Sequence, residues 1–412
     1  MKQTEIGLIP DDWEVKSLGE IGEPCMCKRI LKEQTSPTGD IPFYKIGTFG
    51  GIPDAYISRE LFEQYKEQYN YPKKGTLLLS AAGTIGRVVV FDGKDSYFQD
   101  SNIVWIDNDE TKVTNDFLFY CYSRMQWKTE EGGIVSRLYN ANLKSTSFIA
   151  PKSLVEQERI AKALSDVDAL ISTTEKLIQK KKNIKQGAMQ NLLTGKKRLP
   201  GFGDKQTDLF VPNGTHTKEV KDVSPEQIRL SAKMKQTELG EIPEDWEVKS
   251  LGEMLKIGHG KDYKNLKSGN VPVYGTGGYM TSVNDFLYEG ETVCIGRKGT
   301  IDKPQYHSGK IWTVDTLFYT YDFKSLNPKY LFYKFCLIDW LSMNEASGVP
   351  SLTAKNIEAI QITIPTEEEQ TAIANVLSSM DKEIETLNTK LEKYRNLKTA
   401  MMQQLLTGKI RL

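Results

Sequence analysis

The chain has 412 residues, of which 39% are hydrophobic and 26% are charged. This length suits two or three domains of ordinary size, and the composition is that of a folded protein, not of a disordered chain. Lysine plus arginine and aspartate plus glutamate both number 54, so the net charge is zero. The balance argues against nucleic-acid binding through bulk positive charge. A DNA-binding protein of this composition has to gather its cations on one face.

The cysteine pattern gives no sign of a metal site. The chain has five cysteines without a CxxC pair and three scattered histidines. A structural zinc site needs four converging ligands, usually supplied as close pairs. Cys25 and Cys27 form the only close pair in the sequence, so we expect reduced thiols and no metal. The opening lacks the apolar core of a signal peptide, and no apolar run approaches the ~20 residues of a membrane span. We therefore expect a soluble, cytoplasmic protein that does not bind membranes.

The sequence repeats itself. The first twenty residues, MKQTEIGLIPDDWEVKSLGE, return at 234–253 as MKQTELGEIPEDWEVKSLGE with seventeen identical positions. Later in each half, IAKALSDVD (160–168) matches IANVLSSMD (373–381), and LLTGKKRL (192–199) matches LLTGKIRL (405–412). Self-similarity of this kind indicates a duplicated architecture. We therefore predict an internal repeat with pseudo-two-fold symmetry.

Between these matching segments the two halves diverge. A skeleton persists, including Asp100 beside Asp315 and FLFY (117–120) beside YLFY (330–333). Runs such as 76–91, 97–106 and 291–301 are short, rich in β-forming residues and interrupted by glycine, which is typical of strands joined by turns. We predict two mixed α/β domains, at 1–155 and 234–366. One frame thus carries two different inserts.

The segments after Pro151 and Pro365 have the apolar period of long helices. We predict helices at 156–195 and 367–412, each of ~40 residues or about 60 Å. One exposed helix cannot bury its own apolar stripe, so the simplest partner of each helix is the other, in an antiparallel coiled coil. Packing of each helix on its own domain is the alternative. The predicted seam comprises Ile160, Leu164, Val167, Ile171 and Ile178 of the first helix and Ile373, Leu377, Met380, Ile384, Leu387, Leu391 and Tyr394 of the second.

Residues 200–233 are rich in proline, glycine and charge and have no counterpart in the other half, so we predict a linker at 196–233. The predicted fold class is α+β, with two mixed α/β domains separated by two long antiparallel helices.

Two segments look like catalytic motifs. Residues 10–16 (PDDWEVK) resemble a compressed nuclease signature, but two intervening residues cannot place the carboxylates on neighbouring strands. Burial of Trp13, and of Trp246 in the second copy, is the expected role of this segment. NPKY (327–330) resembles the NPPY box of adenine methyltransferases, but its counterpart is TNDF (114–117). Thr114 and Asn327 both suit a helix N-cap. No Walker A motif or glycine-rich cofactor loop is found, so we expect no catalytic residue.

The IPxDWExxxLGE opening, the variable region and the closing QxLLTGKxRL together resemble the specificity subunit of type I restriction–modification systems, over nearly the whole chain. The resemblance implies that each variable region reads one part of a bipartite double-stranded DNA target. It implies that the helices space the two target-recognition domains and bind methyltransferase subunits, two in number, with restriction subunits in the full complex. It also implies a non-catalytic chain without cofactors of its own, because S-adenosylmethionine, ATP and magnesium belong to the partner subunits.

Polar and basic residues on the glycine-interrupted loops are the candidates for DNA contact, since backbone there can approach phosphate and side chains can reach a groove. The cluster KKKNIK (180–185) is a further candidate, for phosphates or for a partner subunit. A coiled-coil adaptor that binds only proteins is the alternative function, although it predicts similar inserts in both halves. The loop candidates are Ser80, Arg87, Arg137, Tyr139 and Asn140 in the first half and Arg297, Lys298, Lys303, Ser351 and Lys355 in the second.

Overall fold

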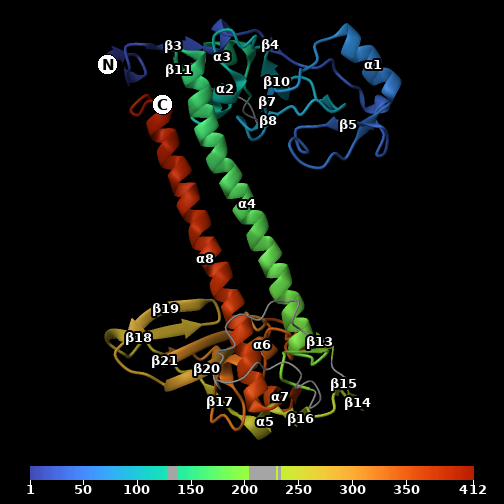
Figure 1. The fold of residues 1–412 in the computed structure, drawn as a ribbon, viewed down its shortest axis with the longest axis vertical. Coiled ribbons are helices and arrows are strands. Elements are labelled where there is room, and N and C mark those ends of the chain that lie inside the picture. The colour runs from blue at the N-terminus through green and yellow to red at the C-terminus, as the bar shows by residue number, and fades with distance from the viewer. Residues whose placement is uncertain (128–136, 204–228, 231–232) are drawn as a thin grey trace, which may run out of the picture. The chain divides into compact units, whose positions relative to one another are not determined.

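The computed structural model describes residues 1–127, 137–203, 229–230 and 233–412. These residues form two compact units, Met1–Thr174 with Lys390–Leu412 and Glu175–Thr389. The two long helices are α4 (Leu154–Leu192) and α8 (Glu367–Leu405), each of 39 residues, which confirms the predicted lengths (Figure 1). The boundary between the units crosses both helices. Each unit therefore holds one variable domain and a part of each helix.

The first domain is built on two small sheets. One has the strand order β4-β10-β7-β8 and the other β6-β5-β9, with β5 and β9 parallel. Helix α1 follows β6, α2 follows β10, and α3 precedes β11 (Ser147–Pro151). The bounds are β4 Pro24–Cys25, β5 Ile41–Tyr44, β6 Tyr56–Ile57, α1 Arg59–Gln68, β7 Leu77–Ser80, β8 Val88–Val90, β9 Tyr97–Phe98, β10 Ile103–Ile106, α2 Asn115–Tyr122 and α3 Asn140–Ser145.

The second domain has a six-stranded sheet of order β17-β22-β20-β21-β18-β19. Its first four strands correspond to β4-β10-β7-β8, and the parallel pair β18·β21 corresponds to β5·β9. One topology therefore occurs twice within the divergent inserts, as the repeat predicts. The bounds are α5 Leu251–Met254, β17 Lys256–His259, β18 Ser268–Gly275, β19 Gly278–Val283, β20 Tyr288–Gly296, β21 Gln305–Thr313, β22 Leu317–Tyr321, α6 Pro328–Phe335 and α7 Ala354–Glu358.

Helices α2 and α6 begin as the sequence predicts. The Thr114 hydroxyl caps α2 by accepting from the backbone NH of Phe117, and the Asn327 side chain caps α6 by accepting from the NH groups of Lys329 and Tyr330. Such caps satisfy NH groups that lack a partner in the first helical turn. The NPKY segment is therefore a helix start.

The repeated opening segment closes each domain. Strand β3 (Trp13–Ser17) pairs antiparallel with β11 (Ser147–Pro151), and β16 (Glu247–Ser250) pairs with β23 (Gln361–Ile364). Short hairpins precede them, β1 (Lys2–Thr4) with β2 (Gly7–Ile9) and β14 (Met234–Thr237) with β15 (Gly240–Pro243). Trp13 and Trp246 are both 0% exposed, so the tryptophans anchor this segment as predicted.

The closing segment of each copy packs against the opening segment of the other. In the second unit, Gly195 has a φ of +71°, and a Cβ there would lie 2.5 Å from Cδ of Pro243. In the first unit, Gly408 has a φ of +66°, and a Cβ there would lie 2.5 Å from Cγ of Pro10. Only glycine adopts this backbone freely and leaves room for the proline. The retained LLTG and IP sequences are two sides of one contact.

An arginine completes each of these contacts. Arg198 donates from both Nη atoms to the Asp245 carboxylate, each at 2.9 Å, and from Nε and Nη2 to the Glu369 carboxylate, each at 2.6 Å. Arg411 forms the same pair with Asp12, at 2.9 and 2.6 Å. Strand β12 (Lys197–Arg198) also pairs with β13 (Arg229–Leu230). The segment 196–233, assigned above to a linker, thus begins with residues that the second unit holds, while 204–228 and 231–232 lie outside the described residues.

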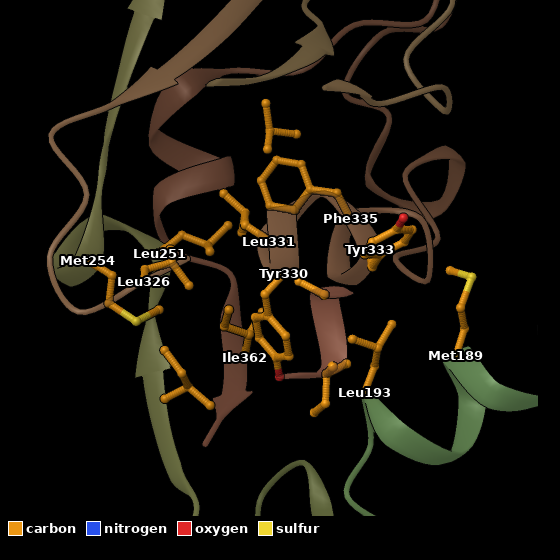
Figure 2. Close-up of a cluster of buried hydrophobic side chains, with 14 of the residues drawn as sticks. Met189, Leu193, Leu251, Met254, Leu326, Tyr330, Leu331, Tyr333, Phe335 and Ile362 are labelled. Atoms are coloured by element: carbon orange, nitrogen blue, oxygen red, sulfur yellow. The ribbon is translucent and has the colours of Figure 1, made fainter. Parts of the chain in front are cut away.

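Figure 2 shows the end of α4 in the core of the second unit. Met189 of α4 and Leu193, which directly follows α4, lie in one buried cluster with Leu251, Tyr330 and Ile362 of the second domain. In the first unit the end of α8 has the same place, because Leu405 and Leu406 join the cluster of the first domain. Each helix therefore starts at its own domain and ends in the core of the other.

Every residue of the predicted helix seam is buried or half-buried. Near the helix ends the seam joins the domain cores, with Ile160 and Leu164 in the first unit and Ile373 and Leu377 in the second. Helix–domain packing, stated above as the alternative, thus accompanies helix–helix contact. In the second unit, Lys181 and Lys185 of the KKKNIK cluster pair with Glu383 (2.7 Å) and Asp381 (2.5 Å) of α8, antiparallel to α4. Within the described ranges, no helix is long and apolar enough to cross a membrane.

Candidate nucleic-acid interface

A groove of about 700 Å³ opens on the first domain. Its lining includes the turn that joins β9 to β10, in which Ser101 has a φ of +56°. A non-glycine residue in this left-handed region carries backbone strain, and such strain gathers at functional sites. Four basic side chains share the groove with two carboxylates and two amides: Arg29, Lys32, Lys45 and Arg137 with Asp54, Asp100, Gln99 and Asn102.

Two of these basic residues form ion pairs within the groove. Nε of Arg29 lies 2.8 Å from Oδ2 of Asp100, and Nζ of Lys45 lies 2.9 Å from Oδ1 of Asp54. The Asp100 side chain is 17% exposed, whereas the Arg29 side chain is 67% exposed. The carboxylate thus sits below the surface and holds an arginine that reaches outward.

The loop 80–87 borders this groove at Arg137, which bridges to Ala82. Ser80 itself is 2% exposed. Its hydroxyl donates to the backbone oxygen of Thr84 at 2.6 Å and accepts from the backbone NH of Arg87 at 2.9 Å. Ser80, a candidate for DNA contact above, therefore shapes the loop and offers no free donor. Arg87 is exposed, with one guanidinium nitrogen bound to the Phe49 backbone oxygen at 2.9 Å.

The second domain has a groove of about 820 Å³ at the corresponding loop. Three of the predicted residues meet there, Arg297, Lys298 and Ser351, and Lys298 forms a β-bridge with Ser351. Arg297 and Lys298 are exposed. His259 and Glu345 also line this groove. Among the described residues, this groove is where several of the candidates predicted in the second half of the chain come together.

Strand pairing sets the correspondence between the two grooves. Ile103 pairs with Ser80, and Leu317 pairs with Gly296. Ala81 and Ala82 therefore occupy the positions of Arg297 and Lys298. Backbone hydrogen bonds agree, since the NH of Leu138 donates to Ala81 and the NH of Leu352 donates to Arg297, both at 2.9 Å. The loop that carries two cations in the second domain carries two buried alanines in the first.

The turn before β10 is one residue longer than the turn before β22. The NH of Gln99 donates to Tyr44 and the NH of Val314 donates to Tyr274, at 2.9 and 3.0 Å, so Gln99 and Val314 are equivalent. Beyond the turn, Ile103 and Leu317 are equivalent. Asp100 and Asp315 therefore each begin the turn, which agrees with the correspondence drawn from the sequence.

The remaining candidates lie apart from these grooves. Lys303 lines a different groove with Tyr306 and Lys329. Lys355 is exposed on α7, and Tyr139 and Asn140 are exposed at the start of α3. The structure does not gather these four residues with Arg297 or with Arg137.

Several groove residues were not among the sequence candidates. Arg29, Lys32 and Lys45 come from segments next to β4 and β5, and His259 ends β17. They lie outside the glycine-interrupted loops that carry the predicted candidates. The signal that could have found them is the alignment of IPFYKIG (41–47) with VPVYGTG (271–277), which places β5 and β18 in one frame.

The grooves offer hydrogen-bond donors and positive charge. Burial raises the pKa of the Cys27 thiol, two residues before Arg29, to about 12, which keeps it protonated at neutral pH. Burial lowers the pKa of His307 to about 4, which keeps that imidazole neutral. No group of His, Cys, Asp or Glu in the described ranges is arranged to hold a metal ion. Guanidinium, ammonium and amide groups on a groove suit contacts to phosphates and base edges.

Known proteins resemble the chain in sequence and in fold. A protein of Haemophilus influenzae named as a putative type I restriction enzyme specificity subunit is 59% identical over 160 residues, which cover 39% of this chain and 41% of that protein. The MjaVIII specificity subunit of Methanocaldococcus jannaschii is 25% identical over 98% of this chain and 94% of its own length. The crystal structure of a type I restriction–modification system S subunit from M. genitalium has a TM-score of 0.61 at 16% identity, with 98% of both chains covered.

The family model described as "Type I restriction modification DNA specificity domain" matches residues 10–185 and 243–393. These ranges cover most of both halves of the repeat. Each range includes one variable domain, its groove and much of the long helix that follows it. The chain belongs to the family of type I restriction–modification DNA specificity domains, which it carries twice.

Proposed function

We propose that this chain is the DNA-recognition subunit of a type I restriction–modification complex. Each domain reads one part of a bipartite double-stranded DNA target, and the helices space the two domains. The observation that carries the proposal is the repeated topology with different side chains at equivalent positions, such as Ala81 and Ala82 against Arg297 and Lys298. A frame that is retained while its groove residues change is what two readers of different sequences need.

The partners proposed are two methyltransferase subunits on the long helices and restriction subunits in the full complex. Methyl transfer, ATP hydrolysis and cleavage then belong to those subunits, together with S-adenosylmethionine, ATP and magnesium. The chain itself is proposed to be non-catalytic and to act beside DNA in the cytoplasm.

The test is methylation profiling of the host genome with and without the gene for this chain. A split motif, modified in both parts and lost on deletion, is the expected result. Persistence of every modified motif in the deletion strain would falsify the proposal. Gel shifts with the co-expressed methyltransferase subunits then test whether the assembled complex binds that motif in preference to a scrambled duplex.

A second experiment tests the non-catalytic role. The purified chain, given S-adenosylmethionine, ATP and magnesium, should neither methylate nor cut DNA that carries the motif. Turnover that stays with the chain through successive purification steps would contradict this role.

An adaptor that binds only proteins is the competing function. It requires no difference between the two grooves, and it predicts that charge-removing changes at Arg297 and Lys298 leave the modified motif unchanged. The comparison of modified motifs in such variants separates the two functions.

A further inference from the structure

Arg29 is held in a fixed orientation by Asp100. These residues are 71 positions apart in the sequence, and Nε of Arg29 donates to Oδ2 of Asp100 at 2.8 Å. Asp100 lies in the strained turn at Ser101, and both Arg29 and Asp100 line the groove of the first domain. A half-buried carboxylate that engages Nε restricts the rotation of the guanidinium about its long side chain.

The hydrogen bond to Asp100 leaves the outer edge of the guanidinium available. A guanidinium has five NH donors in a planar fork, and the bond described here uses only the donor on Nε. Among the described residues, the Nη1 and Nη2 groups of Arg29 have no hydrogen-bond partner. Two parallel NH donors on one edge match a pair of acceptors in the same plane.

On duplex DNA, the pair of acceptors that fits this edge is O6 and N7 of guanine in the major groove. Adenine presents a donor in place of O6, and the pyrimidines lack the second acceptor. A phosphate group also accepts two hydrogen bonds. Because phosphates occur at every nucleotide, a phosphate contact carries no sequence information and does not require a guanidinium of fixed orientation. The buttressing by Asp100 therefore favours a base over a phosphate.

The second domain lacks the arginine of this pair. Counting along the paired strands β4·β10 and β17·β22 places Asp262 at the position of Arg29. Asp315 begins the turn after Val314, as Asp100 begins it after Gln99, so two carboxylates stand where the first domain has an ion pair. The Asp262 carboxylate instead accepts from the backbone NH of Lys264 at 3.0 Å. The arrangement thus belongs to the first domain alone within the described residues, as expected of a feature that distinguishes two half-sites.

We propose that Arg29, oriented by Asp100, reads a guanine in the half of the DNA target that the first domain binds. The inference rests on the proposed function and makes it specific by naming the base and the reading residue. Arg29 is not one of the loop candidates predicted from the sequence. It follows β4, whereas Arg297 lies in the loop that follows β20 of the second domain.

The experiment uses the full chain assembled with its co-expressed methyltransferase subunits. Fluorescence anisotropy competition would measure the affinity for duplexes in which each base pair of the first half-site is changed in turn. The variants are Arg29→Ala, Arg29→Lys and Asp100→Asn. The matched control is Arg59→Ala, because Arg59 pairs with Asp95 at 3.2 Å in the same domain but does not line the groove.

Loss of a bidentate arginine contact corresponds to about a 5- to 150-fold loss of discrimination at one base pair. We expect Arg29→Ala to lose the preference for G·C at one position and to retain the preferences elsewhere. Arg29→Lys keeps the charge but not the fork, so it should lose the same preference while its salt dependence stays unchanged. Asp100→Asn should lose part of the preference for G·C at that position, and Arg59→Ala should keep all of it.

Four outcomes overturn the inference, and the last of them overturns the proposed function too. An equal loss of affinity for all duplexes in Arg29→Ala would identify a phosphate contact, and unchanged discrimination would identify a structural ion pair. If Arg29→Ala fails to fold, as judged by its melting curve, Arg29→Lys decides, and a retained preference for G·C in that variant overturns the inference. A wild-type complex without sequence preference removes the proposed function as well, which distinguishes that failure from failure at Arg29 alone.

Discussion

Nζ of Lys398 lies 2.6 Å from Oδ1 of Asp168, and the hydroxyl of Tyr120 donates to the other carboxylate oxygen at 3.0 Å. The second unit repeats this arrangement with Lys185, Asp381 and Tyr333, at 2.5 Å for the ion pair and 2.7 Å for the hydroxyl. In each case the two charges come from α4 and α8 and the tyrosine from the domain.

The first prediction is that this ion pair contributes to helix pairing in the first unit. In a double-mutant cycle with Lys398→Ala and Asp168→Ala, we expect a coupling free energy of about 1 kcal/mol, because both side chains are about two-thirds enclosed. Urea unfolding of the four proteins measures it. The control is the cycle at Lys162 and Asp166, an exposed pair on one face of α4, where coupling should be at most about 0.5 kcal/mol. Equal coupling in both cycles would contradict the prediction.

The second prediction concerns modular reading. Replacement of residues 21–150 with the corresponding region of another family member should change one half of the DNA target and leave the other half intact. The reason is that the frame segments, including β3 and α4, are kept while the groove residues are exchanged. Methylation profiling of a host that expresses the hybrid checks this. A change in both halves would show that the two domains do not read independently.

The third prediction separates the two cations of the second groove. If Arg297 reads a base, Arg297→Ala should cost about 1–3 kcal/mol and relax the preference at one position. If Lys298 contacts a phosphate, Lys298→Ala should weaken binding to all sequences alike and reduce the salt dependence. Binding titrations at several salt concentrations distinguish these effects. The reverse pattern would exchange the two roles, and no effect from either would exclude this groove as the DNA surface.

The fourth prediction is that helix length sets the DNA spacer. An insertion of four residues in each helix, near Thr174 and Leu387, lengthens each by about 6 Å. At roughly 3.4 Å per base pair, the spacer should grow by one or two base pairs while both half-sites stay the same. Methylation profiling measures the spacer, and an insertion of seven residues, one full heptad, controls for disruption of the seam. An active variant that still requires the original spacer would show that helix length does not set it.

The fifth prediction concerns Lys334 on α6, whose Nζ donates to the Leu193 backbone oxygen and the Thr363 hydroxyl, each at 2.8 Å. Burial lowers the pKa of Lys334 from its usual 10.5 to about 7. Between these values the unfolded chain binds a proton that the folded chain does not, so stability should rise with pH from about 7 toward 10.5.

Lys334→Met removes this dependence. The melting temperature of the wild type, relative to that of Lys334→Met, should therefore increase between pH 7 and pH 9, by a few degrees at most. Lys355→Met, at an exposed position on α7, controls for the loss of one charge. A constant difference across this range would mean that Lys334 keeps its proton in the folded chain.

Local signals in the sequence predicted much of the fold. The N-caps at Thr114 and Asn327, the two 39-residue helices and the buried Trp13 all follow from short patterns or from the repeat. These features depend on residues near one another in the chain, where periodicity and capping chemistry act directly.

The contacts that decide the grooves depend on residues far apart. Arg29 meets Asp100 only because β10 lies between β4 and β7, and nothing in the sequence near Arg29 predicts that strand order. Ser80 looked like an exposed loop residue because its sequence neighbours are glycine and alanine, yet its hydroxyl is used within the loop. Local patterns also do not predict that each closing segment packs against the other copy, because residues such as Arg198 and Glu369 are 171 positions apart.

This packing of each closing segment against the other copy bears on how such a gene can change over time. Gly195 of the first copy must fit Pro243 of the second, and Gly408 of the second must fit Pro10 of the first. A mutation in either the opening or the closing segment is therefore selected through its effect on the other copy as well as on its own. Groove residues such as Arg29 and Arg297 are not part of these contacts between an opening and a closing segment. An exchange confined to an insert leaves these contacts between opening and closing segments in place, so it can alter the groove residues without loss of the fold.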